Sequence, residues 1–371
     1  TLDFVELLKK YDGRTPRPVE VAPREPAYFT YTSGTTGPPK GAMNTHENVV
    51  FNAMLYTVFQ KLNDEDVVLG VAPLFHVTGQ VAHLACAAYA GIPVILFFRF
   101  DPEETLKLVE RWKATMTVGS ITVFISLMNH PDIKKRDFST MKKVFSGGAP
   151  VSPAIVESFE KTCGAYIHNI YGLTETNSPS HFPPLGTRLP VDPVTGALSV
   201  GMPAPNTIAK IMDTETGEKE LPPGEVGEIV IKGPMVIPGY WNKPEETAHA
   251  IRDGWLYTGD VGKMDENGWF YVVDRKKDLI IVSGYKVWPR DVEDVLEPLD
   301  RPLRFRECRG RFEHLIGPEV QVGHDAHPAR HPELCREIVR RGHSVENHSQ
   351  HHFNHFALLG LSGLTREIQA A

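Results

Sequence analysis

The chain has 371 residues, of which 41% are hydrophobic and 23% are charged, and its formal net charge at pH 7 is −7. This composition is typical of globular proteins, the length allows more than one domain, and the negative charge argues against general affinity for nucleic acid. The four cysteines are widely spaced, so we expect neither a disulfide framework nor a cysteine metal cage, and a reducing, cytoplasmic location fits. They are Cys86, Cys163, Cys308 and Cys335.

The longest apolar run covers residues 81–98, which is long enough to span a membrane. It is interrupted by His83, Gly91 and Pro93. We therefore predict a small-residue helix, a turn and a buried strand over 92–98 instead of a transmembrane helix. The first residues are polar and amphipathic and lack the apolar core of a signal peptide.

The first feature in chain order that points to chemistry is the run YTSGTTGPPKG at residues 31–41. It lies between a strand-like segment, 27–31, and a helix-like segment, 46–59. Glycines let backbone N–H groups turn toward an anion, and hydroxyls and Lys40 add side-chain donors. The run therefore predicts a phosphate-binding loop, although Gly41 stands where the common nucleotide loop has Ser or Thr. Taken alone, the run is more simply a flexible turn.

Strand-like and helical patterns alternate up to about residue 170, which predicts α/β layers around a largely parallel sheet. From residue 208, short strands separated by turn signals predict a small antiparallel subdomain. The predicted strands are 67–71, 94–98, 117–123, 143–145, 166–169, 209–213, 227–232, 254–257, 261–265 and 269–274. A further β pair is predicted within 277–288. The helices predicted between the early strands are 49–61, 102–112, 123–129 and 153–162.

Four short segments follow with residues suited to a nucleotide, at 146–150, 171–176, 254–260 and 274–278. Adjacent glycines let a flat ligand approach the backbone, and an aromatic ring can stack on a base. Carboxylates can hold magnesium or accept both hydroxyls of a ribose, and arginine can bond ribose or phosphate. Taken singly, each segment is more simply a turn, a helix cap or a surface charge cluster, so the argument depends on their order.

In that order, the motifs resemble those of the adenylate-forming superfamily, which contains acyl-CoA synthetases, firefly luciferases and peptide-synthetase adenylation domains. The resemblance covers about residues 25–296 and includes YTSGTTGPPKG, PLFHVTG, SGGAP, YGLTET, GWLYTGD and DRKKDLIIVSGYKVWPRDVE. The last of these segments is most similar to bacterial long-chain fatty-acid–CoA ligases. The resemblance implies an α/β fold with a partial large domain, made of layered parallel sheets with helices and a small antiparallel β subdomain, followed by a short α/β fragment.

The resemblance implies a ligase that uses ATP and magnesium to convert a fatty or other carboxylic acid to an acyl-adenylate, and then transfers the acyl group to coenzyme A. Lys40, Thr174 and Glu175 would act in catalysis, with Thr174 at the α-phosphate and Glu175 on magnesium. His76 would lie near the passage to the acyl pocket, although a core histidine is the simpler alternative, and Lys277 falls at the domain hinge. The residues implied to surround ATP are Thr32, Ser33, Gly34, Thr35, Thr36, Gly37 and Lys40 at the β- and γ-phosphates, Gly147, Gly148, Ala149 and Tyr171 at adenine, and Asp260 and Arg275 at ribose.

Two departures from the family lead us to expect impaired activity. Only 30 residues precede the start of the phosphate loop, whereas the family carries a long N-terminal portion there. The family's catalytic lysine near the end of the C-terminal domain has no counterpart, because no lysine follows Lys286. Losing one cationic stabiliser in a closed site lowers the rate by about 10²–10³-fold.

The composition changes near residues 297–302, since lysine is absent beyond them and histidine becomes frequent after residue 323. Chance variation between domains is one explanation, and a junction between two unrelated segments is the one we favour. Residues 323–371 resemble part of a polysaccharide deacetylase, in which His348 and His352 would bind zinc. The aspartate motif that would complete that site is not found upstream, and a solvated polar loop is the alternative.

Three hypotheses remain open: an acid–CoA ligase, a metal-dependent polysaccharide deacetylase acting through the tail, and a non-catalytic nucleotide-binding remnant in a chimeric chain. Ligase ancestry is favoured because it accounts for most of the sequence. The expected partners are small-molecule substrates, and the oligomeric state is left open. The predicted domains are a nucleotide-binding core (1–207), an antiparallel β subdomain (208–274), the hinge and start of a C-terminal subdomain (275–296), a junction (297–322) and the deacetylase-like fragment (323–371).

Overall fold

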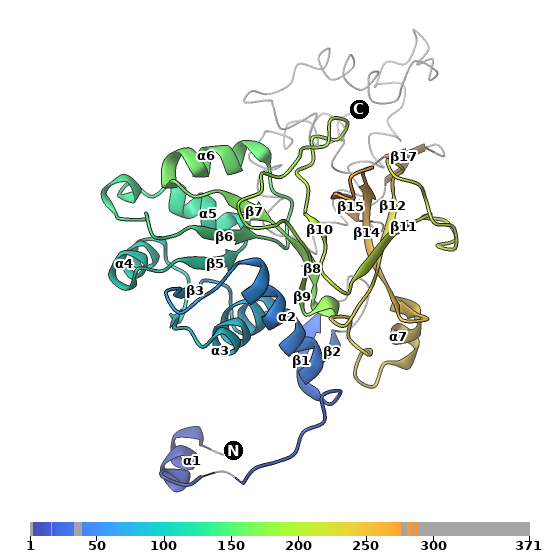
Figure 1. Cartoon of the computed structure of the whole chain (residues 1–371). Coiled ribbons are helices and arrows are strands. Elements are labelled where there is room, and N and C mark those ends of the chain that lie inside the picture. Colours follow the sequence, from blue (N-terminus) through green and yellow to red (C-terminus); the bar gives the residue numbers. More distant parts are fainter. Residues whose placement is uncertain (1–2, 16, 33–38, 276–279, 283–284, 288–371) are drawn as a thin grey trace, which may run out of the picture.

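The structure is a computed structural model that describes residues 3–15, 17–32, 39–275, 280–282 and 285–287. They form helices, one parallel sheet and several antiparallel sheets (Figure 1). Within them, no helix combines the length and the apolar character needed to cross a membrane.

A five-stranded parallel sheet has the order β4 (Val94–Leu96), β3 (Val68–Gly70), β5 (Met116–Gly119), β6 (Lys143–Ser146) and β7 (Ile167–Asn169). Every residue of β3, β5 and β7 is buried. Short strands that are buried along their whole length are typical of a parallel sheet covered by helices on both faces. The sheet and its flanking helices confirm the predicted α/β class.

Three helices pack on one face of this sheet: α4 (Pro102–Trp112), α5 (Ile121–Met128) and α6 (Pro153–Cys163) (Figure 1). Phe124 of α5 and Phe159 of α6 are fully buried, and their rings meet edge to face with centroids 5.5 Å apart. These aromatic side chains anchor the core on this face, because each buries a large apolar area.

A second hydrophobic core includes α2 (His46–Phe59), the π-helix η1 (Thr78–Ala85) and α3 (Cys86–Ala90). Fully buried Tyr56 of α2 packs edge to face on Phe182, with ring centroids 5.4 Å apart. The helix predicted at the start of the 81–98 run begins at Thr78, three residues earlier than expected, and its first part is the π-helix η1. The strand that follows is shorter than predicted, since β4 covers only 94–96.

Local sequence explains where the two best-predicted helices begin. Asp101 caps α4 by accepting a hydrogen bond from the backbone N–H of Glu104 at 2.9 Å, and Pro102 fits the first turn because its missing N–H has no helical partner there. Thr45 and Asn48 form a reciprocal capping box at the start of α2. Helix α4 has the predicted bounds, 102–112, and α2 matches the helix-like segment 46–59, whereas the helical pattern at 49–61 is displaced by two to three residues.

The segment before α2 differs from the prediction. The phosphate-loop run was expected to lead from a strand into a helix, but it joins two antiparallel strands, β1 (Pro26–Thr32) and β2 (Lys40–Thr45). Thr32 pairs with Lys40, so the two ends of the loop lie side by side. Strand β2 forms because residues 40–45 find their hydrogen-bonding partners in β1, which a local pattern does not reveal.

The antiparallel sheet has the order β11 (Ile208–Met212), β12 (Gly227–Lys232), β14 (Trp255–Met264) and β13 (Ile251–Arg252), and β15 (Phe270–Arg275) pairs with β14. The two strands predicted at 254–257 and 261–265 are one continuous strand, β14. Gly259 has φ +74° within it, and the register with β12 shifts nearby. The interruption in the sequence pattern therefore marks an irregular bend in one strand.

A third sheet connects the two larger ones. It consists of β8 (Tyr171–Leu173), β9 (Ser178–Phe182) and β10 (Met202–Pro203), and Gly201 just before β10 forms a bridge to Phe270 of β15. The remaining described elements are α1 (Phe4–Tyr11), η2 (Ile133–Lys135), η3 (Thr174–Thr176), α7 (Pro244–Ala250) and the pair β16 (Ile280–Val282) and β17 (Tyr285–Val287).

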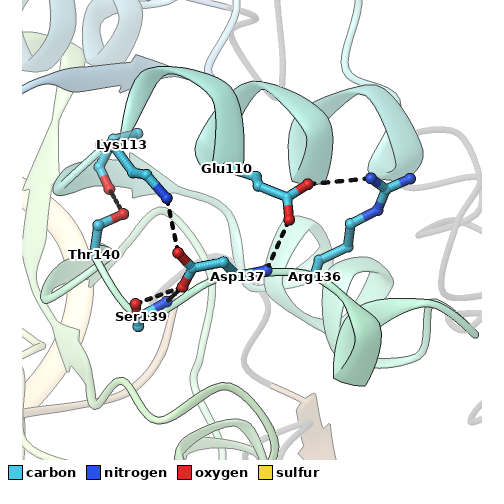
Figure 2. Close-up of polar contacts among 7 residues, drawn as sticks. Glu110, Lys113, Arg136, Asp137, Ser139 and Thr140 are labelled. Atoms are coloured by element: carbon cyan, nitrogen blue, oxygen red, sulfur yellow. Dashed lines mark hydrogen bonds and ion pairs between the residues drawn. The ribbon is translucent and has the colours of Figure 1, made fainter.

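A polar network ties the end of α4 to the segment that leads into β6 (Figure 2). Arg136 pairs with Glu110 at 3.1 Å, and the Lys113 ammonium lies 2.8 Å from the Asp137 carboxylate. Hydrogen bonds from Lys113 and Ser139 lower the pKa of Asp137 well below its usual range. The network joins α4 to residues 136–140, which lie between η2 and β6 outside any helix or strand, and so orders that segment.

Candidate functional site

The glycine pair after β6 lies at the carboxyl edge of the parallel sheet, where ligands bind in open α/β folds. A Cβ placed on Gly147 would lie 2.8 Å from the carbonyl oxygen of Ile170, so the two chain segments pack closely there. Gly148 has φ +80°, and a Cβ at that position would meet no atom within 4 Å. The backbone of Gly148 therefore faces open space, as an adenine-binding turn requires.

Tyr171 and Asp260 meet, although they lie in different sheets. The Tyr171 hydroxyl donates a hydrogen bond to Asp260 Oδ2 at 2.7 Å. Asp260 in β14 is paired in register with Arg275 at the end of β15. Three residues that the resemblance assigns to adenine and ribose thus come from segments that the fold brings together.

The turn that carries Thr174 and Glu175 is the short 3₁₀ helix η3, and its backbone is unusual. Asn177 and Ser178, which follow it, have φ of 54° and 87°, so both adopt left-handed conformations that are rare outside glycine. A Cβ on Gly172 would lie only 2.1 Å from the carbonyl oxygen of Ser178. The YGLTET motif therefore needs its glycine for close packing of β8 on β9, and it holds a strained turn of the kind found at functional sites.

Buried asparagine amides from β2 and α2 hold this turn in place. Asn52 Nδ2 donates to the carbonyl oxygens of Thr176 and Asn177, at 2.8 and 2.6 Å. Asn44 Nδ2 donates to Asn177 Oδ1 at 2.8 Å and to the carbonyl oxygen of Thr174 at 3.3 Å. Asn44 and Asn52 are fully buried. The Asn52 amide thus gives the carbonyl oxygens of Thr176 and Asn177 a buried donor, and the Asn44 amide holds the Asn177 side chain against the turn.

The sequence analysis did not identify these asparagines. A signal was present, because Asn48 and Asn52 are four residues apart on a mostly apolar helix and so share one face. Asn48 Nδ2 donates to the carbonyl oxygens of Pro234 and Val236, at 2.7 and 3.2 Å. Amides on a buried helix face need partners, which predicts a polar segment packed against α2.

Lys40 and Glu175 are linked by a third residue, Tyr240, which the sequence analysis also missed. The Tyr240 hydroxyl donates to Glu175 Oε1 at 2.6 Å, and the Lys40 ammonium lies 4.6 Å from the centre of the Tyr240 ring. Tyr240 is only 5% exposed. Burial and the neighbouring negative charge of Glu175 raise the pKa of Tyr240, so its hydroxyl keeps its proton and donates.

The other predicted residues fall into three groups. Thr32 ends β1, and its hydroxyl lies 3.5 Å from the carbonyl oxygen of Lys40, so it adjoins the start of β2. His76 is exposed just before η1, where its Nδ1 accepts a hydrogen bond from the backbone N–H of Thr78, and no described contact joins it to Glu175. Ala149 is exposed. Ser33, Gly34, Thr35, Thr36, Gly37, Lys277, His348 and His352 lie outside the described residues.

The donor set fits magnesium held together with a nucleotide. Magnesium usually takes one or two protein carboxylates and completes its shell with water and phosphate oxygens. Glu175 offers such a carboxylate: Tyr240 bonds Oε1, and no bond to Oε2 from another described residue is found. No group of three or more His, Cys, Asp or Glu side chains is placed to hold a metal by itself in the part of the chain that the structure describes.

A hollow of about 340 Å³ lies elsewhere, at the amino ends of β6 and β7. Two of its basic side chains are already paired, Lys143 with Asp66 at 2.6 Å and Arg188 with Glu160 at 2.8 Å. Because ligands of open α/β sheets bind at the opposite, carboxyl edge, we do not assign the nucleotide to this hollow. Its lining residues are Lys142, Lys143, Glu160, Tyr166, His168, Leu185, Gly186 and Arg188.

Similar proteins are known. Residues 2–241 match the family described as AMP-binding enzyme. The long-chain-fatty-acid–CoA ligase of Bacillus subtilis is 43% identical over 273 residues, which are 73% of this chain and 47% of that protein. The feruloyl-CoA synthase of an Amycolatopsis species is 38% identical over 266 residues, which are 72% of this chain and 52% of that protein.

Solved structures agree. ATP-bound MatB from Rhodopseudomonas palustris superposes with a TM-score of 0.69 at 32% identity, covering 77% of this chain and 55% of that one. O-succinylbenzoate coenzyme A synthetase (MenE) of Bacillus subtilis, in complex with ATP and magnesium, gives 0.68 at 30% identity, with 78% and 59% covered. The chain spans about half the length of the curated relatives named above. These findings confirm the resemblance inferred from the motifs: the chain belongs to the AMP-binding family of adenylate-forming enzymes.

Proposed function

We propose that this chain binds ATP with magnesium and carries the adenylate-forming site of an acid–coenzyme A ligase. The observation that supports the proposal most directly is the contact of Tyr240 with both Lys40 and Glu175. Sequence motifs assign Lys40 to the phosphates and Glu175 to the metal, and the two residues belong to distant segments. Their convergence on one side chain is what a shared phosphate and metal site requires.

Each part of the site has a task in binding ATP. The Lys40 ammonium, together with donors of the preceding loop, would hold the β- and γ-phosphates, and Thr174 would donate a hydrogen bond at the α-phosphate. The backbone of Gly148 and the ring of Tyr171 would face adenine, and Asp260 would accept the ribose hydroxyls. Magnesium bound by Glu175 and the phosphates would neutralise negative charge on the transferred group.

The proposed reaction has two displacement steps. A carboxylate oxygen of the acid attacks the α-phosphorus of ATP, the bond to the bridging oxygen breaks, and pyrophosphate leaves with the electron pair. The thiolate of coenzyme A then attacks the acyl carbon, and AMP leaves with the electron pair of the acyl–oxygen bond. Fixed cationic and hydrogen-bonding groups favour the first step, because negative charge spreads over the phosphate oxygens in its transition state.

We propose a long-chain fatty acid as the substrate, since curated relatives that cover most of this chain carry that name. An aromatic acid is the alternative, in line with the feruloyl-CoA synthase among the relatives. Both acids place a carboxylate at the end of a largely apolar body. They differ in the length and shape of that body.

The test uses the full 371-residue chain. Calorimetry should detect ATP binding that becomes tighter when magnesium is added, and Lys40→Ala should weaken it by at least tenfold, whereas Lys135→Ala on the surface should not. ATP–pyrophosphate exchange with palmitate and with ferulate then identifies the acid. A wild-type chain that is folded but does not bind ATP in the presence of magnesium would refute the proposal.

A further inference from the structure

Tyr240 lies between two groups of opposite charge and contacts each with a different part of its side chain. Its ring faces the Lys40 ammonium, 4.6 Å from the ring centre, and its hydroxyl lies 2.6 Å from Glu175 Oε1. No direct ion pair within 4 Å joins Lys40 to Glu175, both of which are among the described residues. The phenol therefore separates a lysine and a glutamate that are near enough to share one partner.

The backbone around Tyr240 is anchored to the segments that carry both charged residues. Tyr240 forms a bridge to Ala42 of β2, and the N–H of Trp241 donates to the carbonyl oxygen of Gly41 at 2.8 Å. On the other side, the N–H of Ile237 donates to the carbonyl oxygen of Glu175 at 3.0 Å. The segment 237–241 thus links the strand of Lys40 to the turn of Glu175.

The backbone of Tyr240 itself is also anchored to a helix. The N–H of Tyr240 donates to the hydroxyl of Thr247 at 2.9 Å, and the Thr247 hydroxyl donates to the carbonyl oxygen of Lys243 at 2.7 Å, which ties the residue to α7. With the ring buried and the backbone held on both sides, the hydroxyl has little freedom to leave Glu175. A group held in this way can set the geometry of its neighbours, since positions within a site depend on the packing behind it.

We propose that Tyr240 is a positioning residue that keeps Lys40 and Glu175 apart, so that the lysine is available to phosphate and the glutamate to magnesium. This inference rests on the proposed function. A direct ion pair would consume the lysine's charge and block the carboxylate as a metal ligand. The neutral phenol of Tyr240 replaces it with a cation–π contact to Lys40 and a hydrogen bond to Glu175 Oε1, which leave Glu175 Oε2 to the metal.

Removing the hydroxyl alone tests the contact with Glu175. Tyr240→Phe keeps the ring against Lys40 and loses the bond to Oε1. In calorimetry of the full chain, we expect its ATP affinity without magnesium to stay within twofold of the wild type, while the gain in affinity on adding magnesium falls by about tenfold. A merely structural role would lower both affinities together.

Tyr271→Phe is the matched control. Tyr271 is also buried in the fold, and its hydroxyl donates to a carboxylate, Asp265 Oδ2, at 3.0 Å. This variant loses the same kind of bond away from the site, so its magnesium-dependent gain should equal that of the wild type. An unchanged gain in Tyr240→Phe, or an equal loss in Tyr271→Phe, would overturn the positioning role.

Removing the ring tests the separation of charges. In Tyr240→Leu, Lys40 and Glu175 can pair directly, so ATP affinity should fall about tenfold even without magnesium. Adding Glu175→Gln to that variant removes the negative partner and should restore most of the magnesium-free affinity. If the double variant binds ATP as weakly as Tyr240→Leu, the two residues do not pair and the proposal is wrong. If adding magnesium does not raise the ATP affinity of the wild type, the magnesium role in the proposed function is wrong, whatever the variants of Tyr240 show.

Discussion

The hydroxyl of Tyr171 donates to the carboxylate of Asp260 at 2.7 Å, and this bond joins β8, which follows the carboxyl end of β7, to β14 of the five-stranded antiparallel sheet. On its other side, the Tyr171 ring packs on His181, with centroids 5.5 Å apart. The bond therefore fixes a ring that would stack on adenine and a carboxylate that would accept ribose hydroxyls.

Replacing Tyr171 by Phe should lower ATP affinity about 3–10-fold, because the stacking surface stays while Asp260 loses a hydrogen bond of about 1 kcal/mol that orients it. Calorimetric titration with ATP and magnesium measures the change. Tyr257→Phe is the control, since it removes a hydroxyl that donates to the carbonyl oxygen of Gly217 at 3.0 Å in the same sheet as Asp260. Equal affinities for Tyr171→Phe and the wild type would show that the bond does not organise the site.

Replacing Asn52 by Ala should lower the free energy of unfolding by about 2–4 kcal/mol, because it leaves the buried carbonyl oxygens of Thr176 and Asn177 without their donor. Urea denaturation measures the change. ATP affinity should fall as well, since the turn that carries Glu175 loses its support. Asn63→Ala removes an exposed bond to the N–H of Glu65 and should change stability by less than about 0.5 kcal/mol. Equal stability of the two variants would contradict the anchoring role.

Lys263 and Asp192 form a nearly buried ion pair, with side chains 10% and 4% exposed. Burial disfavours the charged form of Asp192, but hydrogen bonds from Lys263 and Thr195 outweigh it and lower the pKa of Asp192. Lys263→Met should therefore lower the free energy of unfolding by about 3–5 kcal/mol, because it leaves a buried charge without its partner.

The control for this pair lies on the surface. Lys135 pairs with Asp132 at 2.7 Å, and Lys135→Met should cost less than about 1 kcal/mol, because water screens the exposed charges. Asp192→Asn combined with Lys263→Met should recover part of the loss. If denaturation curves show the same loss of stability for Lys263→Met and Lys135→Met, the expected difference between the buried and the exposed ion pair is wrong.

The stability of the fold should fall between pH 7 and pH 5, partly because of His83. His83 is fully buried, and burial lowers its pKa from 6.5 to about 4. Between these values the unfolded chain binds a proton on this histidine and the folded chain does not, so stability rises with pH there and is lost on acidification. The loss from one such histidine at pH 5 is about 2 kcal/mol.

Urea denaturation at several pH values tests this prediction. The Nε2 of His83 lies 3.0 Å from the carbonyl oxygen of Val118 and forms a hydrogen bond with it. In the His83→Gln variant, the side-chain amide of the glutamine can donate a similar hydrogen bond but does not titrate. The variant should therefore lose less stability than the wild type on going from pH 7 to pH 5. His181, whose pKa burial lowers to about 3, should account for a further part of the loss. Parallel pH curves for His83→Gln and the wild type would contradict the assignment.

Local sequence patterns predicted the elements whose ends are encoded nearby. Helix α4 has its cap at Asp101 and its proline at Pro102, and β12 is a short β-branched run that begins at Gly227, so their bounds match the prediction. The patterns were less reliable for strands whose extent depends on pairing with strands distant in the sequence. Lys40–Thr45 is a strand only because β1 lies beside it, and β14 continues through Gly259 because β12 and β15 flank it on both sides.

The sequence by itself determined the class of the fold, the family and the identity of Lys40, Glu175 and Asp260 as candidate site residues, because ordered motifs are local and each carries its own chemistry. Only the tertiary structure revealed Tyr240 between Lys40 and Glu175, and the buried amide of Asn52 beneath the turn. The physical reason is that hydrogen bonds and ring contacts depend on distances in space. Residues far apart in the chain become neighbours only when the sheets pack.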